Sequence, residues 1–215
     1  MKIRIILADD HHIMRDGLRA ILERHENIEV VGEAGNGRTV VDLAARLAPD
    51  VVVMDIGMPD LNGVEATRRI TNSAPDVKVI ALSTYSDKQF ILEMLDAGAS
   101  GYMIKSTASD ELLRAIQAVH GNKTYLSPDV AGAVVSTYLD RQGSVQPPVG
   151  GVLGPREREV LQLLAEGRTS RQIAQCLDIS VNTVDAHRRN IMHKLDMHSI
   201  AELTKYAVRE GLTSP

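Results

Sequence analysis

Short apolar runs alternate with amphipathic stretches along the first 120 residues. The runs cover residues 3–8, 28–32, 51–54, 77–82 and 101–104, and they are rich in Val, Ile and Leu. Runs that are apolar at consecutive positions are typical of parallel strands buried on both faces. Between the runs, apolar side chains recur every three or four positions, which predicts helices. This alternation predicts an α/β fold with a doubly wound, five-stranded parallel sheet.

The end of the chain has a different pattern. From residue 153 onward the apolar positions follow only a helical spacing, and residues 178–180 separate two short helices, which predicts a helix-turn-helix. Residues 141–151 contain two prolines and three glycines, which predicts a flexible linker. We therefore predict an α/β domain over residues 1–120, an extra helix (about 128–140) and linker over 121–152, and a small all-α domain over 153–215.

Composition narrows the class of protein. Apolar residues make up 44% and charged residues 24%, which is the usual balance of a globular protein. The single cysteine, Cys176, excludes a disulfide framework and a cysteine-rich zinc site. No apolar run is long enough to cross a membrane, and Arg4 and Asp9 interrupt what would otherwise resemble a secretory signal. We expect a cytoplasmic protein without a membrane partner.

Polar side chains follow the predicted strands at the point where each strand ends. They are Asp9 with Asp10, Glu33, Asp55, Ser83 and Lys105. In an open α/β sheet, the carboxyl ends of the strands meet at one edge, where ligands bind. Clustered carboxylates repel one another unless a cation intervenes, and Mg²⁺ prefers one or two carboxylates with carbonyl oxygen and water.

This constellation predicts a phosphoryl-accepting site. We expect Asp10 and Asp55 to bind Mg²⁺ directly, and Asp9 to bind it directly or through water. Asp55 is the expected nucleophile, which would form an aspartyl phosphate. Lys105 and the Ser83 hydroxyl are expected to contact phosphoryl oxygens.

Each residue taken alone has a simpler interpretation. A single Asp at a strand end is often a helix cap, an isolated lysine is usually solvated, and Ser83 alone would most often cap a local turn. The adjacent His11 and His12 are candidate metal ligands, but histidines at a helix start are more often solvated. The joint pattern favours the site over these alternatives.

Three segments of the first domain resemble the receiver domain of two-component response regulators. They are Ala8-Asp9-Asp10-His11, the run from Met54-Asp55 to Asn62-Gly63, and Ala97 to Tyr102 with the following Lys105. The resemblance implies a flavodoxin-like fold, Asp55 as phosphoacceptor, and Mg²⁺ held by Asp10, Asp55 and the Gly57 carbonyl with help from Asp9. It also implies that Lys105 contacts the phosphoryl group and that Ser83 and Tyr102 form a switch pair. Ser106 replaces a common proline, and Thr84 replaces a common small residue.

The last 60 residues resemble the DNA-binding domain of the NarL/LuxR family, from Arg156-Glu157 through Thr183-Val184 and His187 to Glu202-Leu203. The polar positions of the third helix suit phosphates and base edges, although a solvated helix face would have similar charges. The expected DNA contacts are Arg189 and Lys194, then Arg188, with Asp185, Thr183, His187 and Asn182. Two residues depart from the family: Gly154 stands in place of a threonine cap, and Asp185 in place of a basic residue.

Together the two resemblances imply a phosphorylation-dependent transcription regulator, not an enzyme. Its implied partners are DNA, a sensor histidine kinase and a second copy of the chain, on DNA or after phosphorylation. The alternative is a DNA-binding regulator that works without phosphorylation and is controlled by a protein or small ligand at the receiver. A phosphatase or phosphotransferase is disfavoured because Gly57, two residues after Asp55, supplies no general acid.

Overall fold

The computed structural model describes residues 2–83, 88–105, 109–141 and 153–213. The chain divides into two compact units, the first within residues 1–146 and the second from residue 147 onward, apart from residues 59–61, which group with the second. Each unit is described separately. None of the helices in the described part of the chain is both long enough and apolar enough to span a membrane.

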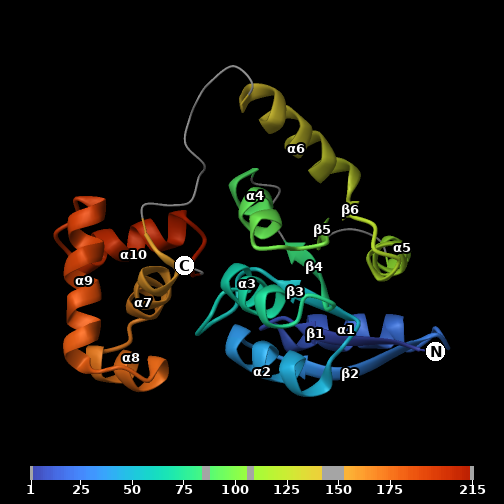
Figure 1. Cartoon of the computed structure of the whole chain (residues 1–215), viewed down its shortest axis with the longest axis horizontal. Coiled ribbons are helices and arrows are strands. Elements are labelled where there is room, and N and C mark those ends of the chain that lie inside the picture. Colours follow the sequence, from blue (N-terminus) through green and yellow to red (C-terminus); the bar gives the residue numbers. More distant parts are fainter. Residues whose placement is uncertain (1, 84–87, 106–108, 142–152, 214–215) are drawn as a thin grey trace. The chain divides into compact units, whose positions relative to one another are not determined.

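The first unit is a parallel sheet with helices on both faces (Figure 1). Its strands are β1 (Ile3–Ala8), β2 (Ile28–Ala34), β3 (Val51–Asp55), β4 (Lys78–Ser83), β5 (Gly101–Ile104) and β6 (Tyr125–Leu126), in the order β2-β1-β3-β4-β5-β6. Its helices are α1 (His12–Leu22), α2 (Gly37–Leu47), α3 (Gly63–Ser73), α4 (Lys88–Asp96), α5 (Ser109–His120) and α6 (Pro128–Arg141). This confirms the predicted α/β class and the parallel sheet.

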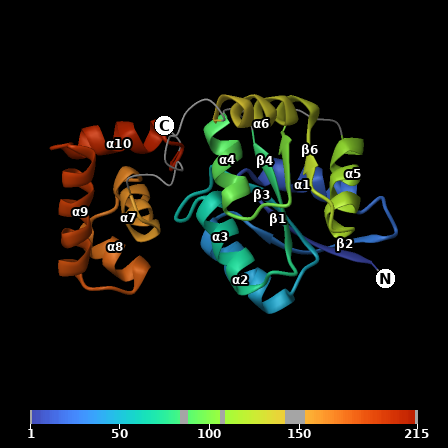
Figure 2. The same ribbon diagram turned by 45° about the horizontal axis from the view of Figure 1, so that its top comes forward.

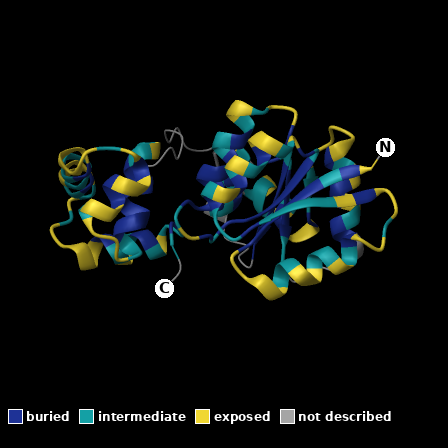
Figure 3. Cartoon of the chain, turned by 90° about the horizontal axis from the view of Figure 1, so that it is seen from below, coloured by how far each residue is buried: buried dark blue, intermediate teal, exposed yellow. Residues whose placement is uncertain are grey.

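The sheet core lies between two helical layers. Helices α1 and α5 cover one face, where Leu22, Ile116 and Val119 pack with Ile5 and Val53 in one apolar cluster. Helices α2, α3 and α4 contact one another in that order on the other face. Strand β3 is buried along its whole length, and β1 and β4 are buried except at Arg4 and Lys78, whereas the outer faces of the helices are largely exposed (Figure 3). The long apolar runs of β1 and β3 are explained by this double coverage.

The prediction of five strands is wrong by one. The sixth strand, β6, pairs Tyr125 with Gly101 and Leu126 with Tyr102. A two-residue strand has no measurable alternation, so no sequence pattern indicated it. The predicted extra helix is α6, which packs against α4 and β5 and so completes the same unit (Figure 2). The predicted linker, residues 141–151, lies outside the described residues except for Arg141, which is the last residue of α6.

The second unit is all-helical, as predicted. Its helices are α7 (Pro155–Ala165), α8 (Ser170–Leu177), α9 (Val181–Leu195) and α10 (Ile200–Arg209), which enclose a core of aliphatic side chains. The Thr169 and Ser180 side chains cap α8 and α9, each accepting a hydrogen bond from a backbone N–H in the first turn. Asp178 ends α8 in the left-handed conformation, which makes the sharp turn into α9.

Helix α3 begins directly against the end of β3. The Gly63 N–H donates to the Ile56 carbonyl at 2.8 Å, and a Cβ at Gly63 would lie 2.0 Å from the Asp55 carbonyl oxygen. No side chain fits in that space, because real Cβ contacts of this length do not occur. Glycine at position 63 therefore allows the chain to fold back beside Asp55.

We predict that Gly63→Ala lowers the free energy of unfolding of the first unit by about 1–3 kcal/mol, because the added methyl group displaces backbone. Gly17→Ala is the matched control: Gly17 lies inside α1, and its added Cβ would meet nothing within 4 Å. That change should stabilise the unit by about 0.5–1 kcal/mol. Chemical denaturation followed by circular dichroism measures both changes. Equal stability of the two variants would contradict the close approach at Gly63.

Candidate functional site

Four side chains converge at the carboxyl end of β1 and β3. Asp9 and Asp10 follow β1 directly, His11 comes next, and Asp55 is the last residue of β3. Each offers one ligand atom, and these atoms lie within 4.8 Å of one another. The sheet order places β1 beside β3, which explains why residues 45 positions apart meet here (10 to 55).

Lys105 joins this group from the end of β5. Its Nζ lies 2.7 Å from Asp9 Oδ2 and 2.9 Å from Asp55 Oδ2, and all three side chains are buried. The Lys105 N–H also donates to the Ser83 carbonyl at 2.6 Å, which ties the end of β5 to β4. Three carboxylates and one ammonium leave two negative charges in the pocket. The donor set therefore fits a divalent, oxygen-preferring cation.

Burial and neighbouring charges oppose each other at the two central groups. Burial raises the pKa of the Asp55 carboxyl, the Lys105 ammonium lowers it and Asp9 raises it again, with a raised value as the result. Burial of the Lys105 ammonium favours its neutral form, but the Asp55 and Asp9 carboxylates prevail and raise the pKa of Lys105. Lys105 therefore stays charged beside Asp55 at neutral pH.

The backbone also holds the acids in place. Asp55 Oδ1 accepts from the Ile56 N–H at 2.8 Å, and Asp9 Oδ1 accepts from the His11 N–H at 2.9 Å. Asp9 thus holds the turn before α1, but the helix-cap alternative is wrong for it, because the N-cap of α1 is His11 and no side chain caps this helix. His11 Nδ1 lies 2.7 Å from Asp10 Oδ1. The sequence argument ranked His11 as solvated, and its ring is indeed largely exposed, but its Nδ1 faces the pocket.

Arg15 is a residue that the sequence analysis missed. Its Nη1 donates to the Asp9 carbonyl at 2.6 Å, and its Nε lies 3.3 Å from Glu33 Oε2. Arg19 holds the other oxygen of Glu33 at 2.5 Å. Glu33, which follows the same strand-end pattern as the acids, is therefore bound by two arginines instead of joining the pocket. An arginine inside an amphipathic helix carries no special sequence signal, so only the fold shows this role.

The remaining predicted receiver residues lie near the same edge. Ser83 ends β4 and Tyr102 lies in β5, and both are buried. Gly57 lies in the bend that follows Asp55. Thr84 and Ser106, the two departures from the receiver pattern, fall outside the described residues.

The predicted DNA-contacting side chains lie along α9. Asn182, Thr183 and Arg189 are exposed, whereas Asp185, His187 and Arg188 are half-buried. Lys194 is engaged within the domain: its Nζ lies 2.7 Å from Glu157 Oε2 in the first turn of α7. The structure thus assigns Lys194 an intramolecular partner that the sequence did not indicate.

Glu157 compensates for the missing cap at Gly154. Gly154 has no side chain to cap α7, but its N–H donates to Glu157 Oε2 at 2.8 Å, and Pro155 begins the helix. Burial raises the pKa of Glu157, whereas the Lys194 ammonium and the Gly154 N–H lower it, with a lowered value as the result. One carboxylate therefore joins the start of α7 to the end of α9.

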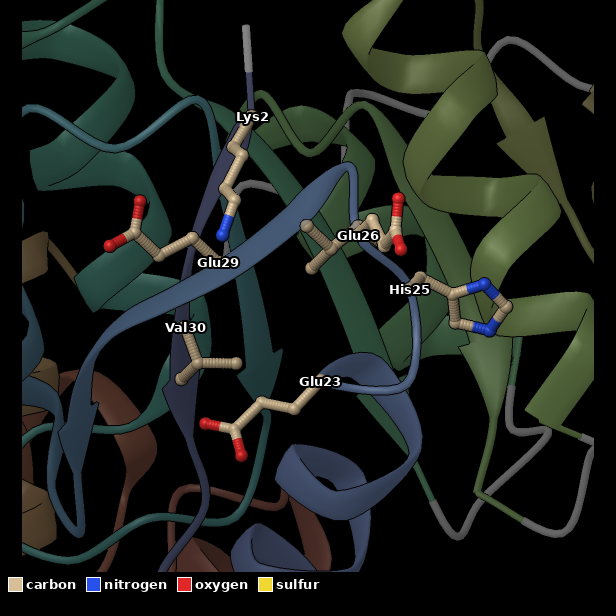
Figure 4. A pocket seen from close by; sticks show the side chains of 7 residues that line it. Lys2, Glu23, His25, Glu26, Glu29 and Val30 are labelled. Carbon is tan, nitrogen blue, oxygen red and sulfur yellow. The ribbon is translucent and has the colours of Figure 1, made fainter.

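A second hollow lies at the opposite edge of the sheet, where β1 and β2 begin. It is lined by Lys2, Glu23, His25, Glu26, Ile28, Glu29 and Val30. Figure 4 shows the three glutamate carboxylates pointing in different directions. They do not converge on a common ligand, unlike the acids beside Lys105.

Comparison with known proteins agrees with both units. Residues 5–117 match the model of the response regulator receiver domain, and residues 151–207 match that of bacterial regulatory proteins of the luxR family. The chain is a LuxR-family response regulator. It joins a receiver domain to a LuxR-type DNA-binding domain, as the two resemblances implied.

Relatives match this response regulator along almost its whole length. The transcriptional regulatory protein MctR of Rhizobium johnstonii is 37% identical over 213 residues, covering 99% of this chain and 96% of MctR. LiaR of Bacillus subtilis is 38% identical over 212 residues, covering 99% of this chain and all of LiaR (100%). Both relatives are transcriptional regulatory proteins.

A solved structure of RcsB from Salmonella enterica serovar Typhimurium has the same two-part organisation. It is 26% identical, covers 96% of this chain and 98% of RcsB, and has a TM-score of 0.62. That RcsB is bound to the rprA promoter in the presence of the phosphomimetic BeF3⁻. Another RcsB structure contains two dimers bound to two parallel DNAs.

We predict that Lys194→Met destabilises the DNA-binding domain by about 1 kcal/mol, a value reduced from that of a buried pair because Lys194 is 41% exposed. Its Tm should fall by roughly 4–8 °C, measured by circular dichroism at neutral pH. Lys205→Met, an exposed change on α10, is the control and should leave the Tm unchanged.

The same pair predicts a pH dependence. Because the pKa of Glu157 is lowered on folding, its contribution is complete above the usual glutamate pKa and is lost as the pH falls through the lowered value. The Tm difference between the wild type and Lys194→Met should therefore shrink on acidification through that range. A difference that persists in acid would contradict the ion pair as its source.

Proposed function

We propose that this response regulator is controlled by phosphorylation of Asp55. The observation that carries the proposal is the position of Lys105 Nζ, within 2.9 Å of carboxylate oxygens of both Asp55 and Asp9. A buried carboxylate with a fixed ammonium beside it is prepared for a dianionic phosphoryl group. The same ammonium offsets the charge that spreads over the phosphoryl oxygens during transfer.

The reaction is a direct phosphoryl transfer. A carboxylate oxygen of Asp55 attacks the phosphorus of a phosphohistidine on a sensor kinase, or of a small acyl phosphate. The P–N or P–O bond to the donor breaks, and its electron pair leaves with the donor group. Lys105 contacts the transferred group, and the Ser83 hydroxyl donates a hydrogen bond to it. The transfer modifies the protein itself and converts no other substrate. In this proposal the chain therefore acts as a regulator, not as an enzyme.

Mg²⁺ is the cation we assign to the pocket. Asp10, Asp55 and the Gly57 carbonyl would hold it, with Asp9 directly or through water. The ion supplies charge neutralisation while Asp55 is phosphorylated. The two uncompensated negative charges and the carboxylate oxygens of Asp9, Asp10 and Asp55 support the assignment.

The phosphoryl signal would pass to DNA through Ser83 at the end of β4 and Tyr102 within β5, which we assign as the switch pair. We take residues 1–120 as the receiver, 121–152 as the connecting helix and linker, and 153–215 as the DNA-binding domain. The expected DNA contacts are Arg189, Arg188, Asn182, Thr183 and His187, with Lys194 after release from Glu157, and Asp185 lies among them on α9. The dimers and the promoter complex of RcsB support a homodimer on DNA for this chain, which we place in the cytoplasm.

We predict that Asp55→Asn abolishes labelling by acetyl phosphate in the presence of Mg²⁺, because the amide is no nucleophile. Intact mass spectrometry measures the added phosphoryl group. Asp76→Asn is the control, since Asp76 is exposed in the turn before β4. That variant should be labelled like the wild type.

Persistent labelling of Asp55→Asn at another residue would overturn the assignment of the nucleophile. DNA selection from random oligonucleotides, with and without acetyl phosphate at one stated salt concentration, tests the regulatory step. We expect tighter binding after phosphorylation. A wild type that is not labelled and binds DNA equally in both conditions would support the phosphorylation-independent alternative instead.

Arg15 provides a separate test of the metal pocket. We predict that Arg15→Ala weakens Mg²⁺ binding roughly tenfold, because the Asp9 carbonyl and Glu33 lose a shared donor that holds the Asp9–Asp10 turn. Titration calorimetry with Mg²⁺ measures the loss. Arg19→Ala is the comparison, since Arg19 also holds Glu33. An equal loss of Mg²⁺ affinity in both variants would show that the effect comes from the contact with Glu33 and not from the hydrogen bond to the Asp9 carbonyl.

A further inference from the structure

Three polar side chains link the two helices of the helix-turn-helix. Ser170, the first residue of α8, donates from Oγ to Asp185 Oδ1 at 3.0 Å. Arg188 Nη1 donates to the same Ser170 Oγ at 3.2 Å and lies 3.9 Å from Asp185 Oδ1. The hydroxyl is therefore a bridge between a carboxylate and a guanidinium on neighbouring turns of α9.

Asp185 is an unusual residue for this helix. It is the one carboxylate in α9, which otherwise carries Arg188, Arg189 and Lys194. An isolated carboxylate on a DNA-facing helix repels phosphates. Here a guanidinium lies close enough to offset that charge, and the Ser170 hydroxyl fixes the direction of the carboxylate. The negative charge of Asp185 is therefore offset locally by Arg188, although both residues lie in α9.

The link also restricts Arg188. Its side chain is 33% exposed, so the guanidinium is accessible from solvent while Nη1 is occupied. The remaining N–H groups of an arginine held in this way keep the fork geometry that matches O6 and N7 of guanine. Residues in the first turns of a recognition helix are those that reach base edges. Arg188 lies in the second turn of α9, one turn after Asp185.

We propose that Asp185 is a positioning residue that sets the DNA sequence preference of this protein through Arg188, with Ser170 as the bridge and guanine as the base that Arg188 reads. The inference rests on the proposed binding of DNA by α9. It differs from direct readout, because Asp185 itself contacts no base. It also differs from simple repulsion, because its effect requires Arg188.

The test uses the full chain treated with acetyl phosphate. The preferred site of the wild type is obtained by DNA selection, and binding is measured to that site and to each single base-pair substitution of it. Four variants are compared: Asp185→Ala, Arg188→Ala, the double variant, and Ser170→Ala. Asp196→Asn is the charge control, since it removes one negative charge about 16 Å beyond Asp185, at the end of the helix.

We expect Arg188→Ala to lose roughly 5- to 150-fold discrimination at one G·C pair, the usual range for a bidentate arginine. Asp185→Ala should lose much of the discrimination at the same pair, and Ser170→Ala a smaller part. In the Arg188→Ala background, the further change Asp185→Ala should have no effect on preference. Asp196→Asn should leave the preference unchanged, and Ser170→Thr, which keeps the hydroxyl, should restore it.

Other outcomes would overturn the proposal in distinguishable ways. If Asp185→Ala tightens binding to all sequences equally and keeps the preference, Asp185 acts by repulsion alone. If it loses discrimination even without Arg188, Asp185 reads a base itself. If the wild type shows no preference among sequences, the proposed DNA-binding function fails, and this inference with it. Circular dichroism is measured for each variant. An unchanged spectrum shows that the domain is still folded, whereas a loss of binding caused by unfolding would change it.

Discussion

The receiver depends on one ammonium group shared between two buried carboxylates. Asp9 and Asp55 come from adjacent strands, and both would be costly to bury as anions without a partner. Lys105 provides that partner at hydrogen-bonding distance from each. It does not neutralise the pocket, because one ammonium lies beside the three carboxylates of Asp9, Asp10 and Asp55. This incomplete compensation supports the Mg²⁺ proposed for the pocket.

The DNA-binding domain solves a related problem with different partners. Two of its acids have basic partners: Glu157 in the first turn of α7 pairs with Lys194 in the last turn of α9, and Asp185 in α9 is joined to Arg188 of the same helix through Ser170 of α8. Each of these acids has a basic partner on a helix that carries predicted DNA contacts. The cations that pair inside the domain are therefore among those proposed to contact DNA.

Much of the receiver could be predicted because strand ends in a parallel sheet meet at one edge. Asp9, Asp10, Asp55 and Lys105 each follow an apolar run, so their convergence follows from the topology alone. The helix caps at Thr169 and Ser180 were equally accessible, since capping is a local effect.

Residues whose roles depend on distant partners were not predictable. Arg15 in α1 contacts the Asp9 carbonyl after β1 and the Glu33 carboxylate in β2. Lys194 pairs with Glu157, which is 37 residues earlier in the chain. Neither pairing follows from spacing or propensity. Strand β6 was missed for another reason: two residues cannot display a period.

The backbone of Gly63 lies directly against the end of β3, on one side of the pocket around Asp55. Because no side chain separates the start of α3 from the Asp55 carbonyl, the backbones of α3 and β3 are in direct contact there, with no space left between them. On the other side, Ser83 ends β4, Tyr102 lies within β5, and Lys105 after β5 reaches Asp55. Under the proposed function, the adjustment to a phosphoryl group on Asp55 would therefore fall on β4 and β5, and α6 packs against β5 as the chain leaves the receiver.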